Sequence, residues 1–450
     1  MMADGQGGNG MTDRIALKGR LLSFKDDPAT AGAGALEHHE DGVVLVADGR
    51  IGAVGPAGSV DVGGAEVRTY PEGCLILPGL IDPHIHLPQT RVVASYGAQL
   101  LEWLQTYTFP EEGRFSDRRY AAAVACFFHD ELLRNGTTSA VVFCSVHPES
   151  ADALFAEAER RGMRMLGGKV MMDRGAPDWL LDTPGTGYAE TTDLIRRWHG
   201  RGRLGYAIAP RFAITSTEAQ LAATRALVQE NPGCWLQTHL AENRAEVRLA
   251  RELYPEAASY TDIYDRFGLL GPRSLFGHCI HLDDKEVERL AATGSVAVFC
   301  PTSNLFIGSG LFDLARLRAA GVRTALATDI GGGTSYSMLR TAAEAYKVLQ
   351  LNGQNWPALD AFHAMTRGNA AALGLEDEIG TLAPGSAADM VVLDPNATPA
   401  MRHRMEAVKD GDLAQTLFVL MTMGDDRAVL ETWVAGRCLH RRDDGQTIDP

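Results

Sequence analysis

The sequence predicts an α/β fold in which a (β/α)8 TIM barrel is joined to a small β-sandwich domain built from both termini. Between residues 78 and 384, short apolar segments alternate with helical stretches, a pattern typical of parallel β/α units. Residues 11–77 and 385–450 instead contain short strand-like runs separated by Gly and Asp turns, and neither piece alone offers a full sheet. We expect residues 1–10 to form a flexible tail. A doubly wound open sheet is the alternative for the central region.

Composition and charge narrow the class of protein. The chain has 450 residues, of which 45% are hydrophobic and 22% charged, as in ordinary globular proteins. The net charge of −15 disfavours binding to a phosphate backbone. Seven cysteines without a CxxC pair fit a reducing compartment, and the N-terminal residues lack the pattern of a signal peptide. We expect a cytoplasmic homodimer that acts on a small molecule, with neither nucleic acid nor membrane as a partner.

Eight apolar segments are the candidate strands of the barrel. They are Leu80–Leu87, Ser139–Phe143, Met165–Met171, Leu204–Pro210, Cys234–His239, Ser274–His278, Val296–Cys300 and Arg323–Asp329. Helical candidates at residues 117–134, 217–230, 283–293 and 337–351 fall in the gaps between them. The length of the central region suits an eightfold barrel with insertions.

The segment at residues 89–113 is too long for a simple connection between a strand and a helix. It carries the large apolar side chains Trp103, Tyr107 and Phe109. Long loops with apolar anchors at such a place are often lids. We therefore expect this segment to close over a bound substrate.

The first candidate strand ends in two histidines separated by one residue. Because side chains alternate between the two faces of a strand, His84 and His86 point to the same side. Pro88 follows and cannot continue a sheet ladder, so both histidines fall at the carboxyl end of the strand. In a TIM barrel, that end carries the chemistry. The pair is suited to binding a metal ion.

Three further candidate strands end in groups that can bind a metal: His239, His278 and Asp329. Each has an alternative interpretation, since a single strand-end histidine is usually structural and an aspartate before glycines can cap a helix. Their joint occurrence at one barrel mouth favours a metal site.

Zinc fits a site of three histidines and one carboxylate, and iron(II) or cobalt fits the same set. We predict His84, His86, His239 and Asp329 as the ligands of one metal per chain. His278 is then left for electrostatic stabilisation and proton handling.

Glu242 follows His239 by three residues, near the start of a predicted helix. One interpretation is a solvated glutamate in the first helical turn, favoured by the helix dipole. We favour the other interpretation, in which Glu242 is a general acid and base next to the metal.

Together these motifs resemble the metal-dependent amidohydrolase superfamily over about residues 40–440. The resemblance is carried by the segments PGLIDPHIH, THLAE, GHC, TSN and GSAADMVVLD, and by the TD pair before three glycines. The segments HLPQ, WLQTYTFPEE, FCS, GKVMMDR, APRF, HLAEN, GHCIHL, CPTSN and TDIGGGTS are similar to the members that deaminate guanine. The resemblance therefore implies zinc-dependent hydrolysis of guanine to xanthine and ammonia.

The resemblance also implies roles for particular residues. Gln89 and Arg211 would hydrogen-bond the polar edge of the purine, and Phe212 would pack on its face. In the reaction Glu242 would move the proton, with help from His278 or Asp329.

Binuclear members of the superfamily carry a lysine at the end of the fourth strand. The fourth candidate strand here ends in Pro210 and Arg211, so one metal is expected. Lys169 lies on the third candidate strand, and we interpret it as structural or as a neighbour of the pocket.

Two alternatives remain open at this point. One is another mononuclear deaminase or chlorohydrolase, acting on an oxidised guanine, an adenosine derivative or a triazine. The other is a non-catalytic scaffold protein on the same fold.

Overall fold

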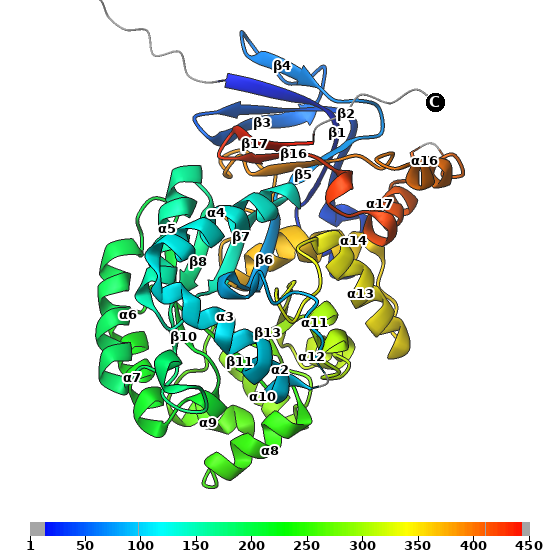
Figure 1. Ribbon diagram of the computed structural model, residues 1–450. Helices are drawn as coiled ribbons and strands as arrows, with labels where there is room; N and C mark the ends of the chain where they lie inside the picture. The colour runs from blue at the N-terminus through cyan, green and yellow to red at the C-terminus, as the bar shows by residue number, and fades with distance from the viewer. Residues whose placement is uncertain (1–13, 98, 410, 443–450) are drawn as a thin grey trace, which may run out of the picture.

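The computed structural model describes residues 14–97, 99–409 and 411–442. It confirms the expected fold class, a TIM barrel accompanied by a second sheet that contains strands from both ends of the chain (Figure 1). The tail expected at residues 1–10 lies outside the described residues. We propose that the two units divide near residues 77 and 385, as the sequence predicts.

The barrel strands follow the predicted segments closely. They are β6 (Leu80–His86), β7 (Thr137–Phe143), β8 (Arg164–Gly168), β10 (Gly205–Pro210), β11 (Trp235–Leu240), β12 (Ser274–His278), β13 (Val296–Phe299) and β14 (Arg323–Leu326). Neighbouring strands pair in parallel in this order. The third segment divides into β8 and the short β9 (Val170–Met171), which pairs with β10.

The barrel is closed by backbone hydrogen bonds between β6 and the residues after β14. The Asp329 N–H donates to the His84 carbonyl at 2.9 Å, and the His86 N–H donates to the Ile330 carbonyl at 2.8 Å. The eighth strand ends at Leu326, before the predicted end at Asp329. Asp329 therefore lies beyond the strand, in the chain that closes the barrel against the two histidines.

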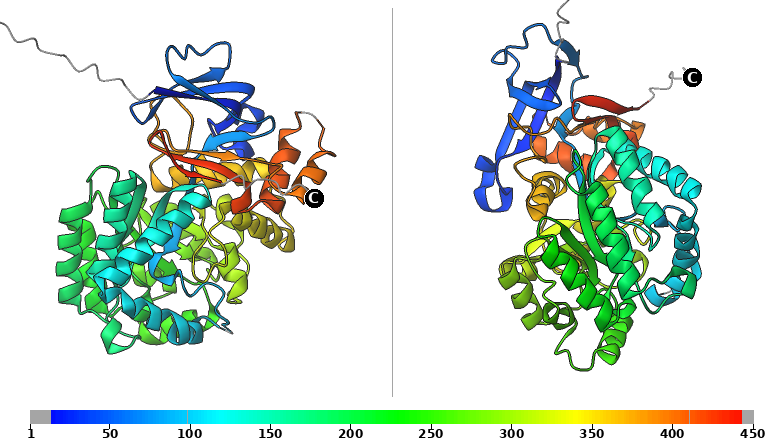
Figure 2. Two further views of the ribbon diagram at one scale, coloured as in Figure 1. Left: turned by 45° about the horizontal axis from the view of Figure 1, so that its top comes forward. Right: turned by 90° about the vertical axis from the view of Figure 1, so that its left-hand side faces the viewer.

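Helices surround the barrel and cover its outer face (Figure 2). They include α4 (Arg118–Arg134), α5 (Pro148–Arg161), α6 (Pro184–Trp198), α7 (Glu218–Glu230), α8 (Arg244–Leu253), α9 (Tyr260–Arg266), α10 (Asp284–Thr293), α11 (Pro301–Phe306), α12 (Leu314–Ala319) and α13 (Met338–Leu351). Local signals set several of their ends. A capping box between Asp283 and Glu286 begins α10, and left-handed Gly294 ends it, because these residues satisfy the free backbone groups of a helix terminus. In the part of the chain that is described, no helix has the length and apolarity needed to cross a membrane.

The second sheet lies beside the amino ends of the barrel strands (Figure 1). It contains β1 (Arg14–Phe24), β2 (Leu36–Ala47), β3 (Arg50–Pro56), β4 (Glu66–Thr69), β5 (Leu75–Pro78), β15 (Met390–Leu393), β16 (Val429–Val434) and β17 (Arg437–Arg441). The antiparallel pairing of β5 with β15 joins the two ends of the chain. After β5, Gly79 leads directly into β6, and a Cβ there would lie 2.1 Å from the Thr138 hydroxyl. Only glycine fits this close approach.

The amino ends of the barrel strands are filled by apolar side chains. Ile81, Val141 and Trp235 belong to a buried cluster there, together with Leu373 from α15 (Asn369–Leu373). The Trp235 Nε1–H donates to the Leu373 carbonyl at 3.0 Å. The carboxyl ends of the strands, where the predicted site residues lie, form the other mouth of the barrel.

Residues 100–113 are helical, where the sequence suggested an open loop. They form α2 (Leu100–Trp103), a π-helical turn at Leu104–Thr108 and α3 (Phe109–Gly113). Trp103 and Phe109 are buried, so the apolar anchors expected from the sequence are present. The remaining helices α1 (Pro28–Ala31), α14 (Ala358–His363), α16 (Pro399–Met405) and α17 (Leu413–Met423) lie near the second sheet (Figure 1).

Candidate metal centre and substrate pocket

The four predicted metal ligands converge at the carboxyl ends of the strands. Nε2 of His84 lies 3.4 Å and Nε2 of His86 lies 3.2 Å from Oδ1 of Asp329. Nε2 of His239 lies 3.3 Å from Nε2 of His86. All four side chains are buried. The alternation argument for His84 and His86 is therefore confirmed by their common approach to Asp329.

The hydrogen bond of His239 identifies the ring nitrogen that is free to bind a metal. Its Nδ1 lies 2.7 Å from the backbone carbonyl of Arg211. A carbonyl only accepts, so this nitrogen carries the proton and Nε2 presents a lone pair. That lone pair points toward Nε2 of His86. Two facing imidazole nitrogens of this kind are the donor arrangement that a shared cation satisfies.

The surroundings of the histidines also favour a bound metal. Within the described residues, neither ring nitrogen of His84 has a hydrogen-bond partner, although both are buried. Burial lowers the pKa of His86 to about 4, and burial with neighbouring histidines lowers the pKa of His239 well below its usual value. Neutral imidazoles have the lone pair that a metal requires. The cluster therefore fits a divalent metal ion.

Space for the His84 ring depends on a glycine in the neighbouring strand. A Cβ on Gly277 of β12 would lie 2.5 Å from Cε1 of His84. Real Cβ atoms do not approach a ring carbon this closely. The glycine in the GHC segment is thus needed for the packing of a predicted ligand.

Asp329 is held in an unusual backbone conformation with an ionised side chain. Its φ is +54°, a left-handed value that is uncommon for a residue other than glycine. Burial alone would raise the pKa of this carboxyl, but its contacts with His84 and His86 outweigh burial and hold the pKa well below its usual range. His278, at the end of β12, is also left-handed, with φ +73°. Such strained residues tend to cluster at functional sites.

Glu242 and His278 form a second polar pair beside the cluster. Oε2 of Glu242 lies 3.4 Å from Nε2 of His278, which lies 3.8 Å from Oδ2 of Asp329. Nδ1 of His278 lies 2.8 Å from Oδ1 of Asn304. Burial and the charge of Asp329 raise the pKa of Glu242 to about 8. A carboxyl with this pKa can hold a proton at neutral pH and also release it.

Glu242 lies just before a helix and not in its first turn, which disfavours the alternative interpretation of a solvated first-turn glutamate. Helix α8 begins at Arg244 with Asn243 as its N-cap, so Glu242 precedes the helix. The Ser309 hydroxyl donates to Oε1 of Glu242 at 2.9 Å, and the Glu242 backbone N–H donates to Oε2 of Glu246 at 2.9 Å. The side chain is buried in the site rather than solvated as a helix-dipole partner would be.

The three predicted substrate-binding residues line one cavity with the metal cluster. The volume of this cavity is about 30 Å³. Its lining residues are His86, Gln89, Leu100, Trp103, Leu104, Arg211, Phe212, His239, Glu242, His278, Ser303, Ile307, Asp329 and Gly332. The α2 segment therefore forms part of the cavity wall, next to the predicted metal ligands.

Lys169 is paired away from the cluster. Its Nζ contacts Asp182 at 2.8 Å and Glu190 at 2.9 Å, and its side chain is fully buried. These ion pairs support the structural interpretation of this lysine.

Sequence reasoning missed four polar residues that hold the site together. They are Glu112, Glu246, Asn304 and Ser309. The sequence carries a signal for Glu246, because an asparagine followed three residues later by a glutamate is the pattern of a capping box, and the structure contains this box between Asn243 and Glu246. Glu112 and Asn304 lie within the motifs WLQTYTFPEE and CPTSN, and Ser309 follows the second of these. Their hydrogen-bond partners are distant in sequence, so the motifs gave no signal for these contacts.

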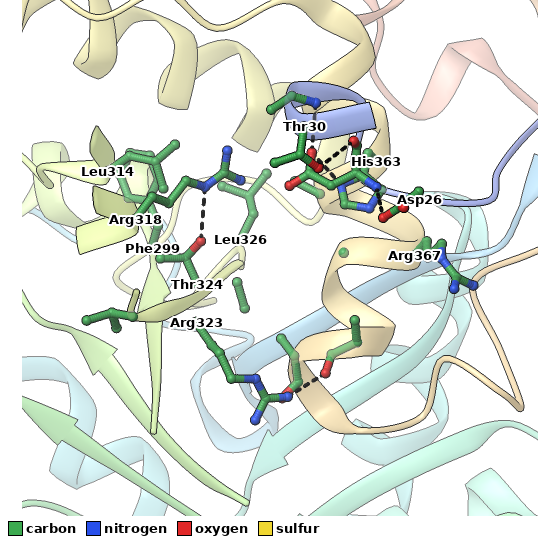
Figure 3. Close-up of a pocket in the computed structure, with 18 of the residues that line it drawn as sticks. Asp26, Thr30, Phe299, Leu314, Arg318, Arg323, Thr324, Leu326, His363 and Arg367 are labelled. Carbon is green, nitrogen blue, oxygen red and sulfur yellow. Dashed lines mark hydrogen bonds and ion pairs between the residues drawn. The ribbon is translucent and has the colours of Figure 1, made fainter. Parts of the chain in front are cut away.

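A second cavity lies elsewhere, between α12, α14 and β14 (Figure 3). The predicted site residues are absent from its lining. Arg323, which borders it, donates to the carbonyl oxygens of Ala371 and Ala372. These bonds give Arg323 a structural role on the outside of the barrel.

Comparisons with known proteins agree with this geometry. A model of the amidohydrolase family matches residues 75–439. A guanine deaminase of Escherichia coli (strain K12) is 48% identical over 413 residues, which cover 91% of this chain and 93% of that protein. The solved structure of E. coli guanine deaminase has a TM-score of 0.92 and 46% identity, covering 95% of this chain and 100% of that chain. A guanine deaminase from C. acetobutylicum with guanine bound in its active site has a TM-score of 0.85 and 26% identity, covering 95% and 100%.

Proposed function

Because the chain belongs to the amidohydrolase family, we propose that it hydrolyses guanine to xanthine and ammonia. The observation that carries this proposal is one cavity in which the histidine and aspartate cluster, the carboxyl of Glu242 and the polar side chains of Gln89 and Arg211 all meet. The test is ultraviolet monitoring of guanine conversion by the purified protein, with ammonia detection. Oxidised guanine, adenosine and triazine substrates in the same assay test the alternative deaminase and chlorohydrolase activities. No turnover of any of them would support the scaffold alternative.

We propose that His84, His86, His239 and Asp329 hold a single zinc ion. When bound, the metal lowers the pKa of a coordinated water toward about 7 and so supplies a nucleophile at neutral pH. Iron(II) and cobalt fit the same donors, and metal analysis distinguishes them. The carbonyl of Arg211 keeps His239 in the tautomer that presents Nε2.

Glu242 is the proposed proton carrier. Its carboxylate accepts a proton from the attacking water and delivers it to N3 of the purine, while the new bond forms at C2. Nε2 of His278 lies 3.4 Å from Oε2 of Glu242 and 3.8 Å from Oδ2 of Asp329. These two residues assist the proton transfer that lets ammonia leave. The hydroxyl of Ser309 holds the other oxygen of Glu242. Glu242 therefore acts first as a base and then as an acid, and its buried position in the cavity suits both steps.

Gln89, Arg211 and Phe212 are the proposed recognition residues. The amide of Gln89 offers both a donor and an acceptor, and the guanidinium of Arg211 only donates. Arg211 can therefore pair with the carbonyl at C6 of guanine but not with the amino group of adenine. Phe212 would pack against the ring.

Substitution of Arg211 should weaken the reaction selectively. Arg211→Ala leaves a substrate carbonyl and a protein carboxylate unpaired. We therefore expect kcat/KM for guanine to fall, with a rise in activation free energy of about 2–4 kcal/mol. The metal content should stay unchanged, because only the backbone of Arg211 contacts a ligand. Steady-state kinetics with elemental analysis check this, and unchanged guanine kinetics would remove Arg211 from the pocket.

Residues 100–113 should become less mobile when a purine is bound. Leu100, Trp103 and Leu104 line the cavity, so substrate departure needs this wall to open. We expect a purine analogue to slow proteolysis and hydrogen exchange in this segment. Helix α6, on the outside of the barrel, serves as the control. Equal sensitivity of residues 100–113 with and without the analogue would contradict a closing segment.

The cytoplasmic location and the homodimer are also proposals. The reducing compartment is supported by buried thiols such as Cys144, Cys279 and Cys300, which are free in the structure. Light scattering of the purified protein tests the dimer, and cell fractionation tests the location.

A further inference from the structure

We propose that Glu112 is a positioning residue that makes the recognition wall of the pocket selective for neutral purines. This inference rests on the proposed function and extends it to a residue with no assigned role. Glu112 belongs to α3, is 0% exposed, and joins the two proposed recognition residues through its two carboxylate oxygens.

The first oxygen sets the orientation of the Gln89 amide. Gln89 Nε2 donates to Oε1 of Glu112 at 3.0 Å, and the Gly331 N–H donates to Gln89 Oε1 at 3.2 Å. A carboxylate only accepts and a backbone N–H only donates. The opposite amide orientation would therefore place two acceptors together and two donors together. The remaining donor and acceptor capacity of Gln89 is fixed for the substrate.

The second oxygen neutralises Arg211. Arg211 Nη1 donates to Oε2 of Glu112, and the side chains are 2% and 1% exposed. A buried guanidinium without a counterion would be costly. The guanidinium also lies over the rings of Phe109 and Phe212, with its carbon 5.4 Å and 6.0 Å from their centroids. Its position is thus defined by one carboxylate and two apolar rings.

Glu112 is itself anchored to the barrel. The Ser145 hydroxyl, just after β7, donates to the Glu112 backbone carbonyl at 2.9 Å. One residue therefore connects the α2–α3 segment, the loop after β6 and the end of β10.

The charges of Arg211 and Glu112 determine whether the pocket prefers neutral or anionic purines. With Glu112 ionised, the Gln89, Arg211 and Glu112 group carries no net charge, so it hydrogen-bonds a neutral ring without attracting an anion. With Glu112 replaced by glutamine, the charge of Arg211 would be uncompensated in a buried site, where electrostatic interactions are strong. Anionic purines should then gain relative to neutral ones.

The experiment compares two purine inhibitors of guanine deamination: hypoxanthine, which is neutral, and urate, which is a monoanion at neutral pH. Turnover of guanine by the wild-type protein is measured first, because its absence would refute the proposed function. In that case the dissociation constants of the two purines, measured by calorimetry on the same variants, replace the inhibition constants and still test Glu112. For Glu112→Gln we expect the ratio of the two inhibition constants to shift toward urate by about tenfold or more, with unchanged metal content. Glu112→Asp keeps the charge and should keep the wild-type preference, although both inhibitors bind more weakly.

A matched control removes a buried carboxylate that pairs with an arginine away from the pocket. Asp389 contacts Arg203 and accepts from the Ala435 N–H. Asp389→Asn should lower stability without changing the inhibitor ratio. If the role of Glu112 were purely structural, Glu112→Gln would weaken both inhibitors equally and would also leave their ratio unchanged.

The reverse charge change keeps the proposal testable if Glu112→Gln does not fold. Arg211→Gln leaves the charge of Glu112, so the ratio should shift against urate. The double variant Glu112→Gln/Arg211→Gln is neutral again and should return toward the wild-type ratio. A ratio that stays at the wild-type value in the single variants that fold would overturn the proposal.

Discussion

Removal of the metal should abolish guanine deamination, and one equivalent of zinc per chain should restore it. In the part of the chain that is described, Nε2 of His86 lies 3.3 Å from Nε2 of His239 and 3.2 Å from Oδ1 of Asp329, and none of these groups supplies a nucleophile by itself. The nucleophile then has to come from ordinary water, whose high pKa leaves almost no hydroxide at neutral pH. Dialysis against a chelator, followed by metal titration with activity and elemental analysis, measures both the loss and the stoichiometry.

A pair of histidine variants separates metal binding from stability. His239 and His129 are both buried, and the Nδ1 of each lies beside a backbone carbonyl, at 2.7 Å and 2.8 Å. Only His239 faces the cluster. We expect His239→Ala to lose metal and activity, whereas His129→Ala should lower stability but keep one metal. Two metals per active chain, or full activity without any, would contradict the single-zinc proposal.

The sequence predicted the barrel well because its signals are local. Each barrel strand is a short apolar run, and period-two alternation places His84 and His86 on one side without any knowledge of the fold. The strand β12 has the predicted bounds Ser274–His278. The carboxyl-end rule for barrels then brings His239 and Asp329 to the same mouth. Pattern and topology together were therefore sufficient to predict that these four side chains lie close together.

The parts that were not predicted depend on contacts between distant segments. Glu112 meets Arg211 across 99 residues of sequence, and Ser309 meets Glu242 across 67. No periodicity marks such pairs. The helical nature of residues 100–113 was also missed, since Pro110 and the short stretches around it read as loop. Pro110 is the second residue of α3 and follows directly on the π-helical turn Leu104–Thr108, where the regular i to i−4 hydrogen-bond pattern that a proline would break is already interrupted.

Replacement of Glu242 by glutamine should reduce kcat by about 10² to 10⁴ while leaving the metal in place. The amide keeps the size of the side chain and can still accept from Ser309, whose hydroxyl lies 2.9 Å from Oε1 of Glu242. It cannot accept a proton from water and return it to the purine. Because the loss falls mainly on the transition state, KM for guanine should change much less than kcat.

Two comparisons make the Glu242 result specific to proton transfer. Ser309→Ala removes one hydrogen bond from Glu242 but keeps its carboxyl, so its effect on kcat should be much smaller than that of Glu242→Gln. Metal analysis of both variants should give the wild-type content, since neither residue is a proposed ligand. If Glu242→Gln keeps near-native kcat with its metal intact, the proton must travel through His278, which lies 3.4 Å from Glu242 and 3.8 Å from Asp329. His278→Ala would then show the larger loss, and Glu242 would be left with a structural role ahead of α8.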